Sequence, residues 1–144
     1  MKAIPKKKIL FLAQLPPPLH GVSKINHLLF SSEQINKKFE CIAIPLNFSE
    51  TLSDIGKFSF KKLTILVKTI LRLIHFLAFK RIDIIYFTMT PSGSAFFRDM
   101  IYILIMRLFK AKKILHFHGL GITQEINKNK LSKNLYNFAF KNSQ

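Results

Sequence analysis

Two histidines near the end of an apolar run are the residues best suited to chemistry. His116 and His118 lie two apart before a glycine, and side chains at that spacing on a strand share one face. Metal binding would need a third ligand, and the only nearby candidate is the isolated Glu125. We therefore expect no metal. His118, at the strand end, is placed to hydrogen-bond a polar substrate, whereas His116 suits a satisfied core position.

A proline-rich loop offers a second site of chemistry. Pro16 to Pro18 exclude helix, and His20 and Gly21 then precede a helical pattern that begins at Val22. A glycine at a helix start lets backbone N–H groups approach an anion such as a diphosphate. The alternative is that Gly21 only permits a tight turn, since GxGxxG is absent.

Arg98 and Asp99 interrupt the first turn of an otherwise apolar helical segment. They follow a loop of small and polar residues at 88–93, which includes Ser92. A structural ion pair, with Asp99 favourably near the helix N-terminus, explains them without any ligand. The alternative is that Arg98 contacts a substrate.

The elements that must position these residues alternate along the chain. Short apolar runs predict strands at 9–13, 39–46, 83–87 and 113–118. Helical spacing predicts helices from 22 onward, with Val22, Ile25, Leu28 and Leu29 as the buried stripe, and at 58–79, 95–109 and 131–140. This alternation predicts one α/β domain, a Rossmann-like parallel sheet with helices on both faces. Ligands bind such sheets at the carboxyl ends of the strands, where the loops 14–21, 88–93 and 118–121 should meet.

The long helix at 58–79 has two contrasting arcs. On a helical wheel, a wide apolar arc suits packing on the sheet and contains Leu63, Leu66, Val67, Ile70, Leu73, Ile74 and Leu77. The opposite arc combines basic and apolar residues, which is typical of an interfacial membrane helix. We expect the membrane-facing residues to be Lys61, Lys68, Arg72, Phe76 and Phe79. The alternative is a solvated lysine-rich face, and the basic interruptions argue against a spanning helix.

The charge of the chain also requires a partner. Lys and Arg number 23 against 7 Asp and Glu, a net charge of +16, which favours a polyanion. No zinc-finger, RNP or helix-turn-helix pattern appears, so we expect an anionic membrane surface and no nucleic acid. The single cysteine, Cys41, fits a buried small hydrophobe in a reducing cytoplasm. The basic start followed by Ile9–Ala13 is too short an apolar run for a signal peptide.

Together these residues resemble the N-terminal domain of the family-four, or group-one, retaining glycosyltransferases, which have the two-domain GT-B architecture. Three stretches carry the resemblance: Lys8–Leu12 with Leu15–Ser23, Asp83–Thr88 with Pro91–Ser94 and Phe97–Asp99, and His116–Gly119. One departure is that the family's paired glycine in the first loop is His20-Gly21 here.

The resemblance implies a function and a set of roles. It implies transfer of a sugar from a nucleotide-sugar to a lipid-linked or polysaccharide acceptor, at the cytoplasmic face of the cell membrane and without a cofactor. Gly21 would contact the donor diphosphate and His118 would be the catalytic residue near the transferring sugar. The acceptor or sugar site would include His20, Ser92 and Arg98.

The resemblance spans Lys8 to Gly121, and the family's donor-binding C-terminal domain has no counterpart in residues 1–144. We therefore expect an incomplete GT-B N-terminal domain, inactive alone, that works with a C-terminal domain or subunit. The alternative is a non-catalytic, basic, membrane-associated protein, or a truncated remnant that kept only the fold.

Overall fold

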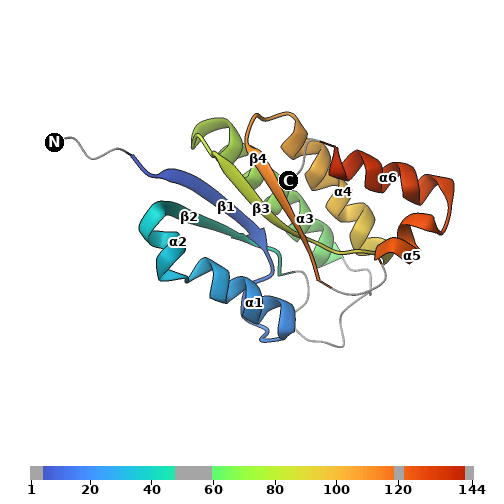
Figure 1. Ribbon diagram of the computed structural model, residues 1–144, viewed down its shortest axis with the longest axis horizontal. Coiled ribbons are helices and arrows are strands. Elements are labelled where there is room, and N and C mark those ends of the chain that lie inside the picture. The colour runs from blue at the N-terminus through green and yellow to red at the C-terminus, as the bar shows by residue number, and fades with distance from the viewer. Residues whose placement is uncertain (1–4, 48–59, 119–121, 142–144) are drawn as a thin grey trace.

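A four-stranded, wholly parallel sheet forms the centre of the molecule (Figure 1). The computed structural model describes residues 5–47, 60–118 and 122–141. The strands lie in the order β2-β1-β3-β4. Their bounds are Lys7–Ala13 for β1, Phe39–Pro45 for β2, Ile84–Met89 for β3 and Lys112–Phe117 for β4. Each predicted strand is confirmed, with ends that move by one or two residues.

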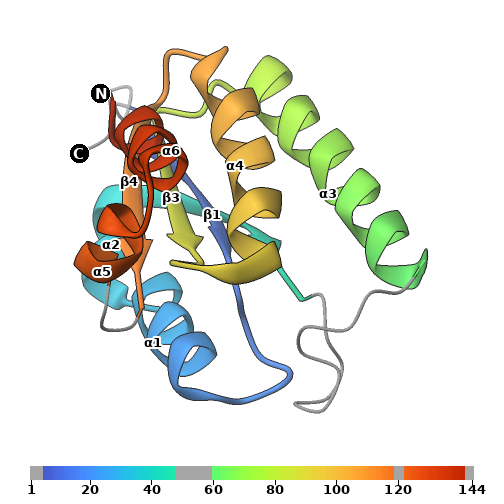
Figure 2. The same cartoon turned by 90° about the vertical axis from the view of Figure 1, so that its right-hand side faces the viewer.

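Helices cover both faces of this sheet (Figures 1 and 2). One face carries α1 and α2, and the other carries α3, α4 and α6, with the short α5 leading into α6. The helices are α1 (Gly21–Phe30), α2 (Glu33–Lys38), α3 (Phe60–Phe79), α4 (Gly93–Arg107), α5 (Ile122–Asn127) and α6 (Lys130–Phe140). The chain therefore has the predicted Rossmann-like α/β fold.

The continuous apolar runs of the strands arise because both faces are covered. Alternate residues of β1 point to opposite sides: Leu10 and Leu12 join the larger core under α3, α4 and α6. Ile9, Phe11 and Ala13 join the smaller core beside α1 and α2. Strands buried on both faces need apolar side chains at every position, which removes the usual period of two.

The buried stripe of α1 differs from the prediction. Ile25 and Leu28 are exposed, whereas Ser23 and Asn26 are fully buried. Polar side chains can be buried when their hydrogen bonds are satisfied, and the Ser23 hydroxyl donates to Pro18 O at 2.8 Å while Asn26 has three partners. Of the apolar stripe, Leu29 does pack beside the smaller core. The burial of Ser23 and Asn26 could not be predicted from apolar spacing, because most of their hydrogen-bond partners lie outside the helix.

The buried arc of α3 is narrower than predicted. Leu66, Ile70, Leu73 and Leu77 pack on the core as expected. Leu63, Val67 and Ile74 were expected there, but they are exposed, and so is Leu71. Phe76 was expected on the membrane side, yet it packs against the larger core. The predicted arc contains more apolar residues than the sheet covers, so packing on the sheet determines which of them are buried.

Two short helices were not predicted. Each has six residues, about one and a half turns, which is too short for a helical period to show. Helix α2 does carry a local signal, because Ser32 caps its N-terminus and Glu33 lies in its first turn. These capping residues could have predicted α2, although the apolar pattern could not.

Candidate functional site

Asn26 links three elements at the carboxyl edge of the sheet. Its Oδ1 accepts hydrogen bonds from Thr88 Oγ1 at 3.0 Å and Tyr86 Oη at 3.2 Å, both on β3. Its Nδ2 donates to Gln14 O at 3.0 Å, at the end of β1. Because Asn26 lies in the middle of α1, this amide joins α1 to the end of β3 and to the residue after β1.

The network continues from β3 to β4. Register places Thr88 opposite His116, and Tyr86 Oη forms a short hydrogen bond with His116 Nδ1. His116 therefore has the satisfied position predicted for it. Tyr86 is buried, and desolvation raises the pKa of its phenol. Tyr86 thus stays protonated at neutral pH, bridging α1 and β4.

His118 is the unsatisfied member of the group. Its ring lies 4.0 Å from that of His116, centroid to centroid, so the two histidines share one face as predicted. Its Nε2 is buried and has no hydrogen-bond partner among the described residues. Desolvation, and secondly the charge of His116, lower the pKa of His118 below its usual 6.5. A neutral imidazole with an unused ring nitrogen can bind a ligand hydroxyl.

The start of α1 is shaped by His20 and Gly21. His20 Nδ1 accepts from Ser23 N at 3.4 Å and His20 N donates to Ser23 Oγ at 2.9 Å, a reciprocal cap. Gly21 is exposed, and a Cβ added to it would meet nothing within 4 Å. Its φ is not left-handed, so neither strain nor internal packing requires glycine there. His20 therefore has a structural role that the sequence did not predict, and Gly21 leaves open space at the start of α1.

Arg98 and Asp99 form the ion pair that was one of the two expectations. Asp99 Oδ1 lies 2.6 Å from Arg98 Nη2, and Asp99 is fully buried. Desolvation raises the pKa of Asp99, against the opposing effect of Arg98. Its Oδ2 accepts from Thr90 N at 2.8 Å, which anchors the loop after β3. Ser92 is the exposed N-cap residue that precedes α4, and Tyr136 Oη on α6 donates to the neighbouring Pro91 O.

The residues expected to face a membrane are divided by the structure. Lys68, Arg72 and Phe79 are exposed on α3, whereas Phe76 packs inward. The side chain of Lys61 lies outside the described residues. No helix in the described ranges is long and apolar enough to cross a bilayer, and the described side chains include no group of three or more potential metal ligands.

Sequence reasoning missed three residues of this site, namely Asn26, Tyr86 and Thr88. Tyr86 and Thr88 are two apart on β3, as His116 and His118 are on β4, so each pair shares a face. That spacing was a usable signal, because two neighbouring parallel strands with polar side chains at their carboxyl ends place them together. The link to Asn26 had no comparable signal.

The comparisons with known proteins add no family to this geometry: no family model, no curated protein and no solved structure matches the chain.

Proposed function

We propose that this chain is the acceptor-side domain of a retaining GT-B glycosyltransferase. The single observation that carries the proposal is that an open helix start and an unpaired histidine nitrogen lie at the same edge of the sheet. Gly21 leaves space at the start of α1, and His118 leaves a buried Nε2 without a partner among the described residues. The Asn26 and Tyr86 hydrogen bonds join α1 to β4 between them.

The proposed chemistry divides between these positions. The N–H groups at the start of α1 would bind the donor diphosphate, which leaves when the bond from the sugar anomeric carbon to the phosphate oxygen breaks. Neutral His118 would hydrogen-bond the transferring sugar and orient it. The acceptor hydroxyl attacks that carbon and loses its proton to the departing diphosphate. A donor-binding domain would complete the cleft, because transfer requires both substrates to be held together.

We propose that the acceptor is lipid-linked or a polysaccharide and that the chain works peripherally at the cytoplasmic face of the cell membrane. The support is the outer surface of α3, where Val67 and Leu71 are 49% and 61% exposed. Lys68 and Arg72 are exposed directly beside them. Apolar groups flanked by cations match an anionic bilayer surface.

The same surface supports a second candidate, a membrane-associated protein without catalysis. It shares the α3 surface with the first proposal but assigns no role to Gly21 or His118. Binding of nucleotide-sugars separates the two candidates.

The first experiment is an NMR titration of the full chain with UDP-, GDP- and dTDP-sugars. We expect shifts of the amides of Gly21 to Ser23 and of the His118 ring. Gly21→Ala should weaken binding about tenfold, since its methyl group occupies only the open space. The control is Lys133→Ala, an exposed site on α6.

The second experiment measures transfer by the chain joined to a donor-binding domain of the resembled family. His118→Ala should reduce transfer at least a hundredfold while the fold is kept. Absence of nucleotide-sugar binding and of transfer, with vesicle binding retained, would leave the non-catalytic candidate. Full transfer by His118→Ala would remove His118 from the site.

A further inference from the structure

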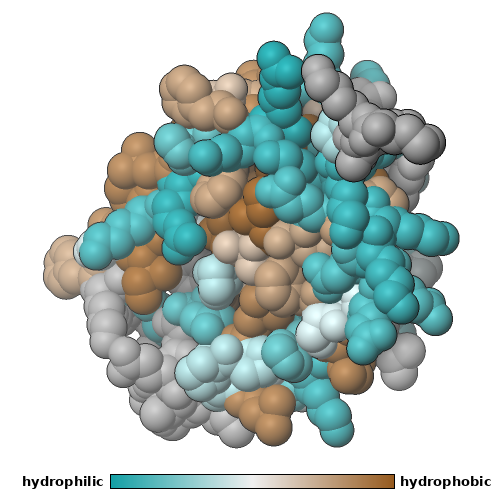
Figure 3. All heavy atoms as spheres, turned by 90° about the vertical axis from the view of Figure 1, so that its left-hand side faces the viewer, coloured by the Kyte–Doolittle hydropathy of each residue, from teal (hydrophilic) through white to brown (hydrophobic). Residues whose placement is uncertain are grey.

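A hollow lies at the amino edge of the sheet, opposite the candidate site. Its volume is about 570 Å³. The first residue of every strand lines it: Lys7 of β1, Phe39 of β2, Ile84 of β3 and Lys112 of β4. Figure 3 shows this end of the molecule with hydrophobic residues in the centre and hydrophilic side chains around them. The hollow is separate from the candidate site because the strands run between the two.

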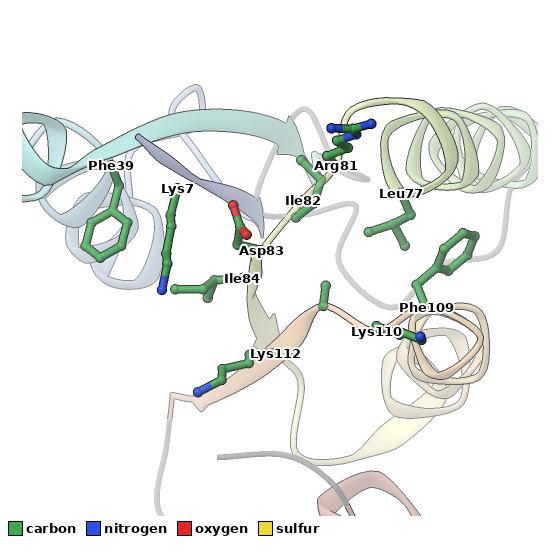
Figure 4. Close-up of a pocket in the computed structure, with 11 residues that line it drawn as sticks. Lys7, Phe39, Leu77, Arg81, Ile82, Asp83, Ile84, Phe109, Lys110 and Lys112 are labelled. Atoms are coloured by element: carbon green, nitrogen blue, oxygen red, sulfur yellow. The ribbon is translucent and has the colours of Figure 1, made fainter. Parts of the chain in front are cut away.

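The rim of the hollow is strongly basic. Lys7, Arg81, Lys110 and Lys112 contribute four cations from three separate segments of the chain (Figure 4). None of the ion pairs formed by described residues involves any of them. The single acid is Asp83, whose Oδ2 accepts from Lys8 N at 2.8 Å. The rim therefore has an excess of three positive charges, if each ionisable group has its usual charge.

The loop that joins α4 to β4 is held by a lysine outside the rim. The buried Nζ of Lys113 donates to Phe109 O at 3.2 Å and Ala111 O at 2.9 Å. Lys110 and Lys112 flank Ala111 in the chain and are exposed, so their ammonium groups are accessible to an anion from solution.

Backbone hydrogen bonds hold the rim in place. Asp83 N donates to Lys8 O at 3.1 Å, and Lys112 N donates to Asp83 O at 2.9 Å, so the starts of β1, β3 and β4 are joined. Arg81 has a φ of 49°, a left-handed conformation that costs a non-glycine residue about 1 kcal/mol. Arginine occupies a position where glycine would be less strained, which favours a role for its side chain.

The floor of the hollow is apolar. Leu77, Ile82 and Ala111 form it from α3 and the segments before β3 and β4, and they retain only 7–9% exposure. Figure 4 shows Leu77 and Phe109 side by side, with Arg81 and Lys110 beside them on the rim. A free inorganic anion would leave this floor uncovered, whereas an alkyl group would cover it.

We propose that this hollow binds a phosphate ester that carries an alkyl chain, with the phosphate on the basic rim and the chain on the apolar floor. This site is independent of the glycosyltransferase proposal. The ester could belong to a soluble metabolite or to a lipid in a bilayer, and the chemistry recognised is the same.

The test is calorimetric titration of the full chain with hexyl phosphate, inorganic phosphate and hexyl glucoside, below any micelle concentration. Hexyl phosphate should bind at least tenfold more tightly than either of the others, because only it satisfies both parts of the hollow. Equal affinity for inorganic phosphate, or for hexyl glucoside, would overturn the proposal.

A charge-matched pair of variants then locates the site. Lys110→Glu with Lys112→Glu should weaken hexyl phosphate binding at least tenfold, because two charge-assisted contacts become repulsive. Lys24→Glu with Lys133→Glu makes the same change of net charge on exposed positions of α1 and α6 and should leave binding within about twofold. Equal losses in both variants would mean a diffuse effect of net charge and would contradict the site.

Vesicles identify the source of the ester. Binding to phosphatidic acid vesicles that is lost with the Lys110 and Lys112 pair assigns a bilayer lipid. Loss of hexyl phosphate binding alone assigns a soluble ester. Gly21→Ala should change neither result, so failure here and failure of the glycosyltransferase proposal are distinguishable.

Discussion

At the scale of one residue, the environment of His118 predicts how the stability of the folded chain depends on pH. Burial, and then His116, lower its pKa in the folded state from 6.5. Between the lowered and the unfolded pKa values the unfolded chain binds more protons, so stability rises with pH there. The contribution of His118 should be complete above pH 6.5 and should be lost as the pH falls through that window.

Two-dimensional NMR of the histidine rings checks this. His118 should titrate below 6.5, and His116→Gln should raise its pKa only in part, because desolvation is the larger cause. A His118 midpoint at or above 6.5 would contradict the buried environment. His118→Asn should remove this share of the pH dependence of unfolding.

Asn26 should contribute far more to the free energy of unfolding than an exposed asparagine such as Asn134. Asn26→Leu has a similar volume but leaves Thr88 Oγ1 and Gln14 O without their partner. Unsatisfied buried groups cost about 1–3 kcal/mol each, so the variant should lose about 3 kcal/mol of unfolding free energy in urea denaturation. Asn134→Leu, on the exposed side of α6, is the control. A loss below about 1 kcal/mol for Asn26→Leu would mean that water replaces the amide.

For single residues, the sequence predicted a side chain's surroundings only where residues close in the chain determine them. His116 and His118 could be placed on one face because strand geometry alone determines it. The Arg98 and Asp99 pair likewise involves adjacent residues. Asn26 was missed because its partners Tyr86 and Thr88 are 60 and 62 residues away, and no local pattern reports them.

At the scale of an element, substitutions on the two faces of α3 should have different effects. A change on the buried face should affect stability, and a change on the exposed face should affect membrane binding. Leu73 is fully buried in the core, so Leu73→Ala should cost about 3 kcal/mol without changing the outer surface. Val67→Glu lies on the exposed face and should change stability by less than about 0.5 kcal/mol. The Val67 variant alone should reduce binding to phosphatidylglycerol vesicles, at least fivefold in a sedimentation assay.

Vesicle binding measured on folded protein distinguishes these variants, with circular dichroism as the check on folding. If Val67→Glu binds as the parent chain does, α3 is not the membrane-facing helix. If Val67→Glu unfolds the chain, Val67 does not lie on an exposed face of α3.

Elements were predictable where length made a pattern visible. The strands and long helices followed from apolar runs and spacing, and only their ends shifted. The six-residue α2 and α5 gave no period to detect. For α3, existence was predictable but orientation was not, because Val67 and Leu73 are equally apolar and only the sheet determines which of them is buried.

At the scale of the whole molecule, the two proposed binding sites lie at opposite ends of one sheet. The carboxyl edge is a hydrogen-bonding site of Asn26, Tyr86 and the two histidines, whereas the amino edge is a basic rim on an apolar floor. Parallel strands impose this division, since every carboxyl end lies at one edge and every amino end at the other. The net charge of +16 belongs to the chain as a whole, so its effect on stability should extend beyond either edge.

A net charge of +16 on 144 residues should destabilise the compact state by self-repulsion. Raising NaCl from 10 mM to 500 mM shortens the screening length from about 30 Å to about 4 Å, so the urea midpoint should rise with salt. A variant with Lys→Glu at the exposed positions 24, 68, 110 and 133 halves the net charge, since each change removes two units. Its midpoint should be higher than that of the parent chain at 10 mM NaCl and should respond less to salt. Equal salt responses of the two chains would show that local ion pairs, rather than the summed charge, govern the stability of the fold.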